Sequence, residues 1–346
     1  RLRGQFQRAV RAPNVIELFT PQGTNLPNLT SGPNGFFDPC AGPNPSATLE
    51  QCARTGVSAD QYGGIPDVIS GQTQSITGGN PNLAPEESDT ITIGAILTPN
   101  AIPGLSVSID YFDIQVDDAI AAGIPAQATL DNCLATGNPA FCDLITRDGG
   151  GSLIAGSPGV GFQQTNINIA TLETSGFDFQ VVYDLDLWDI GLEDMGSVRF
   201  DYASTYLDEL SNTPFPGADP IECAGEHAGS CGVPSPEYRH RMLNTWQTPW
   251  DINVDLIWRY FSSTDNDAGP NVNPRIDREI DTTQYLDLAV RYQFNEELEF
   301  RAGVNNVTGT KIPVVTSAGP PSGNGNTYPA LFDTGRFFFF GATYRL

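Results

Sequence analysis

The sequence is poor in basic residues and has no long apolar run. Lys and Arg number 17 against 41 Asp and Glu, which gives a formal net charge of −24. Binding to nucleic acid depends on a basic surface that neutralises phosphates, so this balance argues against nucleic-acid partners and disfavours anionic partners in general. No stretch of about 20 consecutive apolar residues occurs, which excludes a transmembrane helix but not membrane strands, whose signal is weaker.

Motifs that carry catalysis or bind metal are also missing. The sequence contains no GxSxG, no HExxH and no phosphate-binding glycine-rich loop. Of the two histidines, we expect a structural role for His240 and an exposed loop position for His227. The DNDAG segment at 265–269 resembles the start of a calcium loop, but its twelfth position is Ile276 rather than Glu. We therefore predict no enzyme activity, no cofactor and no metal site, and loose cation binding by acidic loops stays open.

The six cysteines form three close pairs in loop-like stretches. An even number of cysteines in local pairs favours disulfides in an oxidising compartment. Zinc is the rival interpretation, but no CxxC occurs and only two histidines are present. The predicted disulfides are Cys40–Cys52, Cys133–Cys142 and Cys223–Cys231.

Most of the remaining sequence reads as strands in which apolar and polar residues alternate. About ten such segments occur, and the links between them are alternately long and short. All three cysteine pairs fall in long links, so they should lie at one end of the molecule. This arrangement is typical of outer-membrane barrels, which have short turns on one side and long loops on the other. The segments are 2–9, 90–97, 105–112, 163–187 (bulged near Gly176), 198–206, 236–246, 252–260, 286–294, 298–305 and 335–346.

The final segment, GRFFFFGATYRL at 335–346, has a wholly apolar even-numbered face. In a barrel this face would contact lipid, and the charged strand faces would line a wet lumen. We predict that the membrane-facing residues of this strand are Phe338, Phe340, Tyr344 and Leu346. In a secreted β-sandwich, the alternative, the apolar rows would instead meet a second sheet.

Several segments resemble the C-terminal part of the β-barrel of TonB-dependent outer-membrane receptors. They follow the family's order, and NPNLAPEESDT and LETSGFDF are the most specific. The segments are RAVRAPNVIELF (8–19), NPNLAPEESDTITIGAILTP (80–99), GLSVSIDYFDIQVDDAI (104–120), CLATGNPAFCDLITRD (133–148), NIATLETSGFDFQVVY (168–183), PEYRHR (236–241), GVNNVTGTKIP (303–313) and GRFFFFGATYRL (335–346).

The resemblance implies an all-β, transmembrane antiparallel barrel in the outer membrane of a Gram-negative bacterium. Residues 1–346 would be one partial barrel domain, about the last ten strands of a barrel of about 22. The sequence does not begin with Met, which favours a fragment or processed product whose plug and first strands lie upstream. Contact with the TonB complex would run through that plug. The family typically ends in Phe or Trp, so we expect Leu346 to weaken recognition by the barrel-assembly machinery.

The function implied is import of a scarce small-molecule solute that binds the extracellular loops. The resemblance allows a siderophore, a cobalamin-like solute or an oligosaccharide. We predict that loop aromatic residues stack on it: Phe36, Phe37, Tyr62, Phe141 and Phe215. The alternatives are a passive pore or adhesin with a self-closed barrel of about ten strands, and a secreted sandwich. An incomplete barrel would leave unpaired strand edges near 2–9 and 335–346, whereas a self-closed pore would join them.

Overall fold

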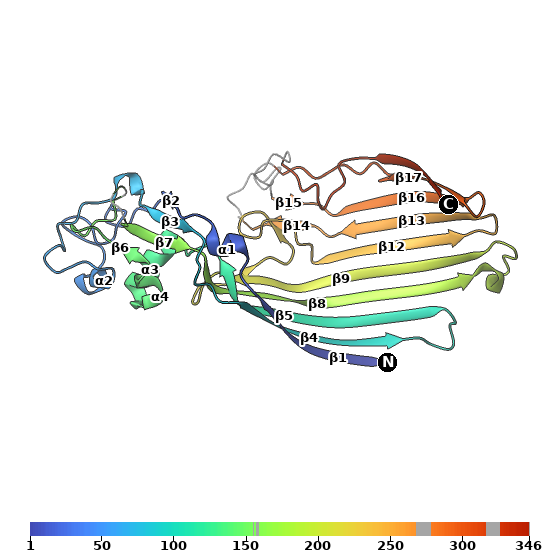
Figure 1. Cartoon of the computed structure of the whole chain (residues 1–346), viewed down its shortest axis with the longest axis horizontal. Helices are drawn as coiled ribbons and strands as arrows, with labels where there is room; N and C mark the ends of the chain where they lie inside the picture. Colours follow the sequence, from blue (N-terminus) through green and yellow to red (C-terminus); the bar gives the residue numbers. More distant parts are fainter. Residues whose placement is uncertain (155, 157–158, 268–277, 316–325, 346) are drawn as a thin grey trace.

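In the described part of the chain, one large antiparallel sheet contains eleven strands, and ten of them lie side by side in the order in which they follow along the sequence (Figure 1). The structure is a computed structural model that describes residues 1–154, 156, 159–267, 278–315 and 326–345. All ten predicted segments overlap a strand of this sheet, but the segment 163–187 is not one strand, because its first residues belong to β7 (Gly161–Thr165) of a second sheet. The ten strands are β1 (Leu2–Arg11), β4 (Glu86–Leu97), β5 (Leu105–Ala121), β8 (Ile167–Asp186), β9 (Ser197–Thr213), β12 (Tyr238–Gln247), β13 (Ile252–Phe261), β16 (Thr283–Gln293), β17 (Leu298–Asn305) and β18 (Phe337–Tyr344).

The links between these strands differ in length at the two ends of the sheet (Figure 1). Short turns join the strands at one end, at 98–104, 187–196, 248–251 and 294–297. The turn at 187–196 includes the 3-10 helix η2 (Leu187–Ile190). Long links occupy the other end, at 12–85, 122–166, 214–237, 262–282 and 306–336. The predicted alternation is confirmed, and every cysteine lies in a long link.

A bulge bends the longest strand where the sequence predicts it. The register between β8 and β9 shifts between Ser175 and Gly176. A Cβ atom at Gly176 would lie 2.3 Å from the carbonyl oxygen of Tyr206, so only glycine allows this close strand approach.

The first two long links fold together rather than remaining irregular. Each link contributes two adjacent strands to one small sheet in the order β2-β3-β7-β6, so the two links are joined where β3 pairs with β7. The long stretch before the second strand of the large sheet is therefore folded, because strands from two distant links pair with each other. The elements of 12–85 are α1 (Val15–Phe19), β2 (Gly23–Asn25), α2 (Leu49–Arg54), η1 (Ile69–Gly71) and β3 (Ser75–Gly78). Those of 122–166 are α3 (Ala126–Thr136), α4 (Pro139–Cys142), β6 (Ile145–Thr146) and β7 (Gly161–Thr165).

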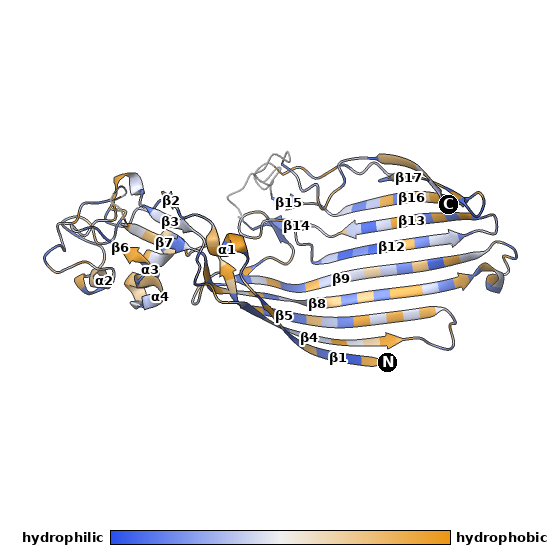
Figure 2. Cartoon of the chain, in the orientation of Figure 1, coloured by the Kyte–Doolittle hydropathy of each residue, from blue (hydrophilic) through white to orange (hydrophobic). Residues whose placement is uncertain are grey.

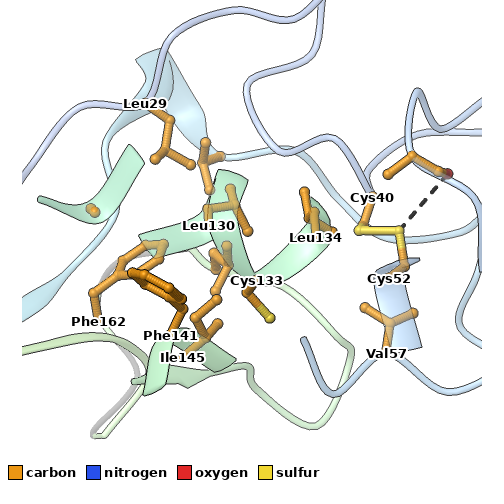
Figure 3. Close-up of a cluster of buried hydrophobic side chains, with 14 of the residues drawn as sticks. Leu29, Cys40, Cys52, Val57, Leu130, Cys133, Leu134, Phe141, Ile145 and Phe162 are labelled. Atoms are coloured by element: carbon orange, nitrogen blue, oxygen red, sulfur yellow. Dashed lines mark hydrogen bonds between the residues drawn. A yellow bond between two sulfur atoms is a disulfide. The ribbon is translucent and has the colours of Figure 1, made fainter. Parts of the chain in front are cut away.

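The larger apolar core lies inside this pair of links, which we call the loop module (residues 12–85 and 122–166). Leu130, Cys133 and Leu134 of α3 pack with Phe162 of β7 and with the Cys40–Cys52 pair (Figure 3). Helix α2 begins with a capping box in which Thr48 and Gln51 exchange hydrogen bonds. The loop module is thus a folded body built on one end of the sheet.

The remaining long links form a second, smaller cluster. A three-stranded sheet of β11 (Glu226–His227), β14 (Thr264–Asn266) and β15 (Glu279–Ile280) joins the links 214–237 and 262–282. The two-residue strand β10 (Ile221–Glu222) pairs with β9. Its buried apolar residues are Ile280 of β15, Tyr285 of β16, and Val315, Tyr328 and Phe332 of the link 306–336. The described parts of the five long links are thereby packed against one another or against the sheet.

The large sheet is open. Strands β1 and β18 end the strand order, and in the described part of the chain they pair only with β4 and β17. This agrees with the two free edges expected of a partial barrel and argues against a barrel closed by these strands alone. In the described ranges, no helix combines the length and the apolarity needed to cross a membrane.

Candidate functional site

Hydrophobic and hydrophilic residues alternate along the strands of the large sheet (Figure 2). The register aligns the hydrophobic residues of neighbouring strands, so they share one face of the sheet. A typical row runs Leu256, Leu288, Val304 and Phe338 on β13, β16, β17 and β18. These side chains are not covered by a second layer, and Phe338 is 68% exposed. A soluble sandwich would bury such rows, so the sandwich alternative is wrong. A continuous uncovered apolar face is what lipid requires of a barrel wall.

Aromatic residues mark the short-turn end of this apolar face. The indole of Trp246 packs edge-to-face on Trp250 at 6.3 Å and donates to the Met195 carbonyl at 2.9 Å. The Tyr344 hydroxyl donates to Glu297 at 2.8 Å. The polar atoms of the Trp246 and Tyr344 rings each make a hydrogen bond, while the apolar part of each ring stays on the apolar face. Aromatic side chains of this kind are typical of the girdle where a barrel meets the membrane interface.

The C-terminal strand presents its predicted residues on the apolar face. Phe338, Phe340 and Tyr344 are exposed, and the Phe340 ring stacks on Phe300 at 6.3 Å. Leu346 lies outside the described residues. Their contact with lipid stays a prediction.

The opposite face is polar and carries ion pairs between strands. Arg3 pairs with Asp110 on one side of the sheet. Asp287 lies 3.0 Å from Arg259, and Asp255 lies 3.4 Å from Arg291. Paired charges of this kind suit a wall that faces water.

A hollow of about 580 Å³ lies on this polar face. Its floor is two adjacent cross-strand rows. One row contains Asp110, Asp178, Thr205, Arg239 and Phe261, and the other contains Ser108, Gln180, Ala203, Arg241 and Arg259. Strand β12 begins at Tyr238, directly after the long link 214–237, so both of its arginines lie near the long-link end. Arg239 and Arg241 were not among the predicted site residues, although their spacing by two residues places both on one face of the strand. Among the described residues neither has an acidic partner, which only the structure reveals.

The five aromatic residues predicted to bind solute come together, but as packing residues of the loop module and its surroundings. Phe141 and Phe215 are buried and meet edge-to-face at 5.7 Å. Phe36, Phe37 and Tyr62 are partly buried against the same core. The Tyr62 hydroxyl donates to the Ala47 carbonyl at 2.9 Å. This packing accounts for their positions, and stacking on a solute stays a prediction for them.

All three predicted disulfides form. The Cα–Cα distances are 5.7 Å for Cys40–Cys52, 4.9 Å for Cys133–Cys142 and 5.4 Å for Cys223–Cys231. Two of them lie in the loop module, and Figure 3 shows the first beside the apolar core. They tie local turns rather than distant links.

The histidines differ from expectation in one respect. His227 is fully buried, not exposed. It lies on β11, which pairs with β14, and its partner in that pairing is Asn266. Its Nδ1 atom lies 3.0 Å from the Thr264 hydroxyl, and burial lowers the pKa of the ring. Burial, with Asp265 and Asp267 nearby, raises the pKa of the neighbouring Glu226.

His240 has a structural position, as expected. It lies on the apolar face, and its ring stacks on Tyr260 at a centroid distance of 5.0 Å. Over the described residues, no three His, Cys, Asp or Glu side chains form a group suited to a metal ion.

Comparison with known proteins agrees with this geometry. The model of the family described as TonB dependent receptor-like, beta-barrel matches residues 1–307. No curated protein matches. Among solved structures, a mutant ferric enterobactin receptor, PfeA of Pseudomonas aeruginosa, is similar with a TM-score of 0.59 and 15% identity. The siderophore receptor PirA of Acinetobacter baumannii is similar with a TM-score of 0.57 and 14% identity. Each comparison covers 99% of this chain but only 38% of the solved chain.

Proposed function

Because the chain belongs to the TonB dependent receptor-like β-barrel family, we propose that it forms wall and outer loops of a receptor that actively imports a scarce solute. The chain is an outer-membrane protein with an antiparallel barrel fold. The observation that carries the proposal is the distribution of side chains on the large sheet. Its apolar face is uncovered, and its opposite, polar face carries the ion pairs and the hollow.

Capture of the solute is assigned to the long-link end. The loop module and the smaller cluster of links lie at that end of the sheet, and disulfides hold their turns. A preformed surface of this kind loses little conformational entropy when a solute binds. The solute classes implied by the family are siderophores, cobalamin-like molecules and oligosaccharides. The similar solved structures are receptors for siderophores, which favours an iron–siderophore complex.

Energy for import would come from the TonB complex through a plug that lies outside this chain. This chain spans about 38% of the length of the solved receptors. The partners of the whole receptor are therefore proposed for it: the plug, the TonB complex, outer-membrane lipid and the barrel-assembly machinery that inserts the strands. The role is transport, with no catalytic step.

Uptake of iron under iron limitation tests the proposal. Cells that carry the full-length gene, a deletion, or the gene in a TonB-deficient background are supplied with individual siderophores labelled with radioactive iron. Import of one siderophore should require both the receptor and TonB. Uptake that persists without TonB would identify a passive pore instead. Receptor-independent uptake of every siderophore would reject the siderophore assignment.

A further inference from the structure

The apolar face of the large sheet carries a hollow of its own, with a volume of about 390 Å³. It spans parts of β12, β13 and β16, and each of these strands has a paired neighbour on both sides. The edges of the sheet therefore do not shape it. Met242, Leu256, Trp258 and Leu286 form its apolar wall. We call it the lipid-face hollow, because it opens on the side of the sheet that faces the membrane.

Polar side chains form one end of the lipid-face hollow. Thr308 and Thr310, at the start of the link 306–336, line it together with Gln284. The two threonine hydroxyl oxygens lie 3.1 Å apart, and the Thr310 hydroxyl donates to the Gln284 carbonyl at 2.9 Å. The Trp258 indole donates to the side chain of Gln284 at 3.2 Å. Since the long links of an outer-membrane barrel are extracellular, this polar end lies toward the headgroups of the outer leaflet.

Asn244 lies at the opposite, deeper end of the lipid-face hollow. It belongs to the cross-strand row of Leu256 and Leu288, two rows from Gln284. Among the described residues, the Oδ1 atom of Asn244 accepts no hydrogen bond although it is buried. Its Nδ2 atom lies 3.5 Å from the Leu256 carbonyl oxygen, which is the outer limit of a hydrogen bond. The amide is thus held weakly, and rotation about its last side-chain bond turns Oδ1 into the hollow.

An amide oxygen without a donor is costly on this face. Hydrocarbon offers no hydrogen bonds, so a polar group beside it is stabilised only by a partner that reaches the same depth. The donors of a lipid headgroup stay at the interface, where Gln284, Thr308 and Thr310 lie. A hydroxyl group on an acyl chain, by contrast, is carried below the interface by the chain itself. It can therefore reach Asn244.

We propose that the lipid-face hollow binds one acyl chain of an outer-leaflet lipid, and that Asn244 accepts a hydrogen bond from a hydroxyl group on that chain. The hollow is continuous with the apolar face, so its occupant comes from the membrane. Its polar end, apolar wall and deep acceptor follow the order of headgroup, methylene groups and hydroxyl in such a lipid. A volume of about 390 Å³ suits a segment of one chain rather than a whole lipid. The inference requires that this face meets lipid and does not depend on solute import.

A pair of lipids that differ by one hydroxyl tests the site. The probes are phosphatidylethanolamine with two myristoyl chains and the same lipid with a 3-hydroxyl on one chain. Native mass spectrometry of the full-length receptor in detergent measures how much of each lipid is bound. The native receptor should bind the hydroxylated lipid about three- to tenfold more tightly, which corresponds to one hydrogen bond. N244L should bind the two lipids equally, because leucine offers no acceptor.

The matched control makes the same substitution outside the lipid-face hollow. Asn212 of β9 also has a buried Oδ1 atom without a hydrogen bond among the described residues, but it does not line the hollow. N212L should therefore keep the preference for the hydroxylated lipid. A second variant, L286W, fills the hollow with a larger side chain and should weaken binding of both lipids at least about threefold. Heat-modifiable gel migration verifies that each variant is folded.

Several results would overturn the proposal. Equal binding of the two lipids by the native receptor would mean that water, and not a chain hydroxyl, serves Asn244. A preference that survives in N244L, or that is lost in N212L as well, would separate it from this side chain. Unchanged binding in L286W would place the lipid elsewhere on the wall. Receptor dimers that form without bound lipid and disappear in N244L would assign the hollow to a second copy. The measurement needs neither TonB nor a solute, so failed uptake would reject the transport proposal and leave the lipid site standing.

Discussion

The Arg147 guanidinium donates to both oxygens of the Asp38 carboxylate, at 2.6 and 3.1 Å, inside the loop module. The side chains are 2% and 0% exposed. Arg147 also donates to the Thr55 hydroxyl at 2.9 Å and to the Gly151 carbonyl at 2.8 Å. Because Asp38 lies in the link 12–85 and Arg147 in the link 122–166, this buried pair joins two loops that are far apart in sequence.

Removing the negative charge from this pair should unfold the loop module without unfolding the barrel. In Asp38→Asn the guanidinium stays buried without its counter-charge, which costs about 3–5 kcal/mol. We expect faster hydrogen exchange throughout 12–85 and 122–166 in D38N and unchanged exchange in the strands of the large sheet. The matched control is E50Q, because Glu50 pairs with Arg54 at 3.3 Å while 85% exposed. Such an exposed pair is worth about 0–1 kcal/mol, so similar effects in the two variants would contradict the argument.

Loss of the Cys40–Cys52 disulfide should loosen the same module. This bond closes a loop next to the apolar core, and removing it in C40S/C52S is expected to cost about 2–4 kcal/mol. Limited proteolysis of intact cells should then cut within 12–85 at lower protease concentrations. The C223S/C231S variant serves as the control, since that disulfide lies in the link 214–237. Equal sensitivity of 12–85 in both variants would show that the effect is not local.

The strands were predictable because their signal is local. Alternation with a period of two fixes which residues share a face, and the short turns leave little freedom in how neighbours pair. Gly176 could be recognised as a bulge within β8 for the same reason. The face assignment and the position of every cysteine followed from these local patterns.

The loop contacts were not predictable because they join residues that no local pattern connects. Asp38 and Arg147 are separated by 109 positions, and nothing in either neighbourhood indicates the other. Phe141 and Phe215 resemble exposed stacking residues in sequence, yet they meet in a core built by different links. His227 is buried for a similar reason: its parallel partner β14 belongs to another long link. The arginine cluster on the polar face needed the pairing of β12 with β13 before its missing partners could be recognised.

Two adjacent valines test the direction of the faces. Val181 pairs with Val107 and Tyr202 on the apolar face, whereas Val182 pairs with Ser106 and Asp201 on the polar face. An arginine on the lipid side of a barrel costs about 2–4 kcal/mol at mid-membrane, and one on the lumen side costs little. We therefore expect V181R to lower the unfolding free energy in lipid vesicles and V182R to leave it nearly unchanged. The reverse order would mean that the sheet is oriented the other way.

Glu226 makes the smaller cluster of links sensitive to pH. Burial and the proximity of Asp265 and Asp267 raise its pKa above the ordinary value of 4.5, so the folded state holds a proton more tightly than the unfolded state. A carboxyl group with a raised pKa destabilises the fold at pH values above that pKa and has no effect below 4.5, where both states are protonated. Glu226→Gln removes this penalty. In E226Q, hydrogen exchange of residues 223–235 should therefore be slower than in the native protein near neutral pH. The ratio of the two exchange rates, native to E226Q, should approach one as the pH falls through the raised pKa toward 4.5.

The controls separate this effect from other titrations. Burial lowers the pKa of the neighbouring His227 in both proteins, so the titration of His227 largely cancels in the ratio. The exposed Asp219 of the same link provides the control, because D219N should leave exchange of 223–235 unchanged at every pH. An E226Q effect that is constant with pH would show that ionisation of Glu226 is not its cause.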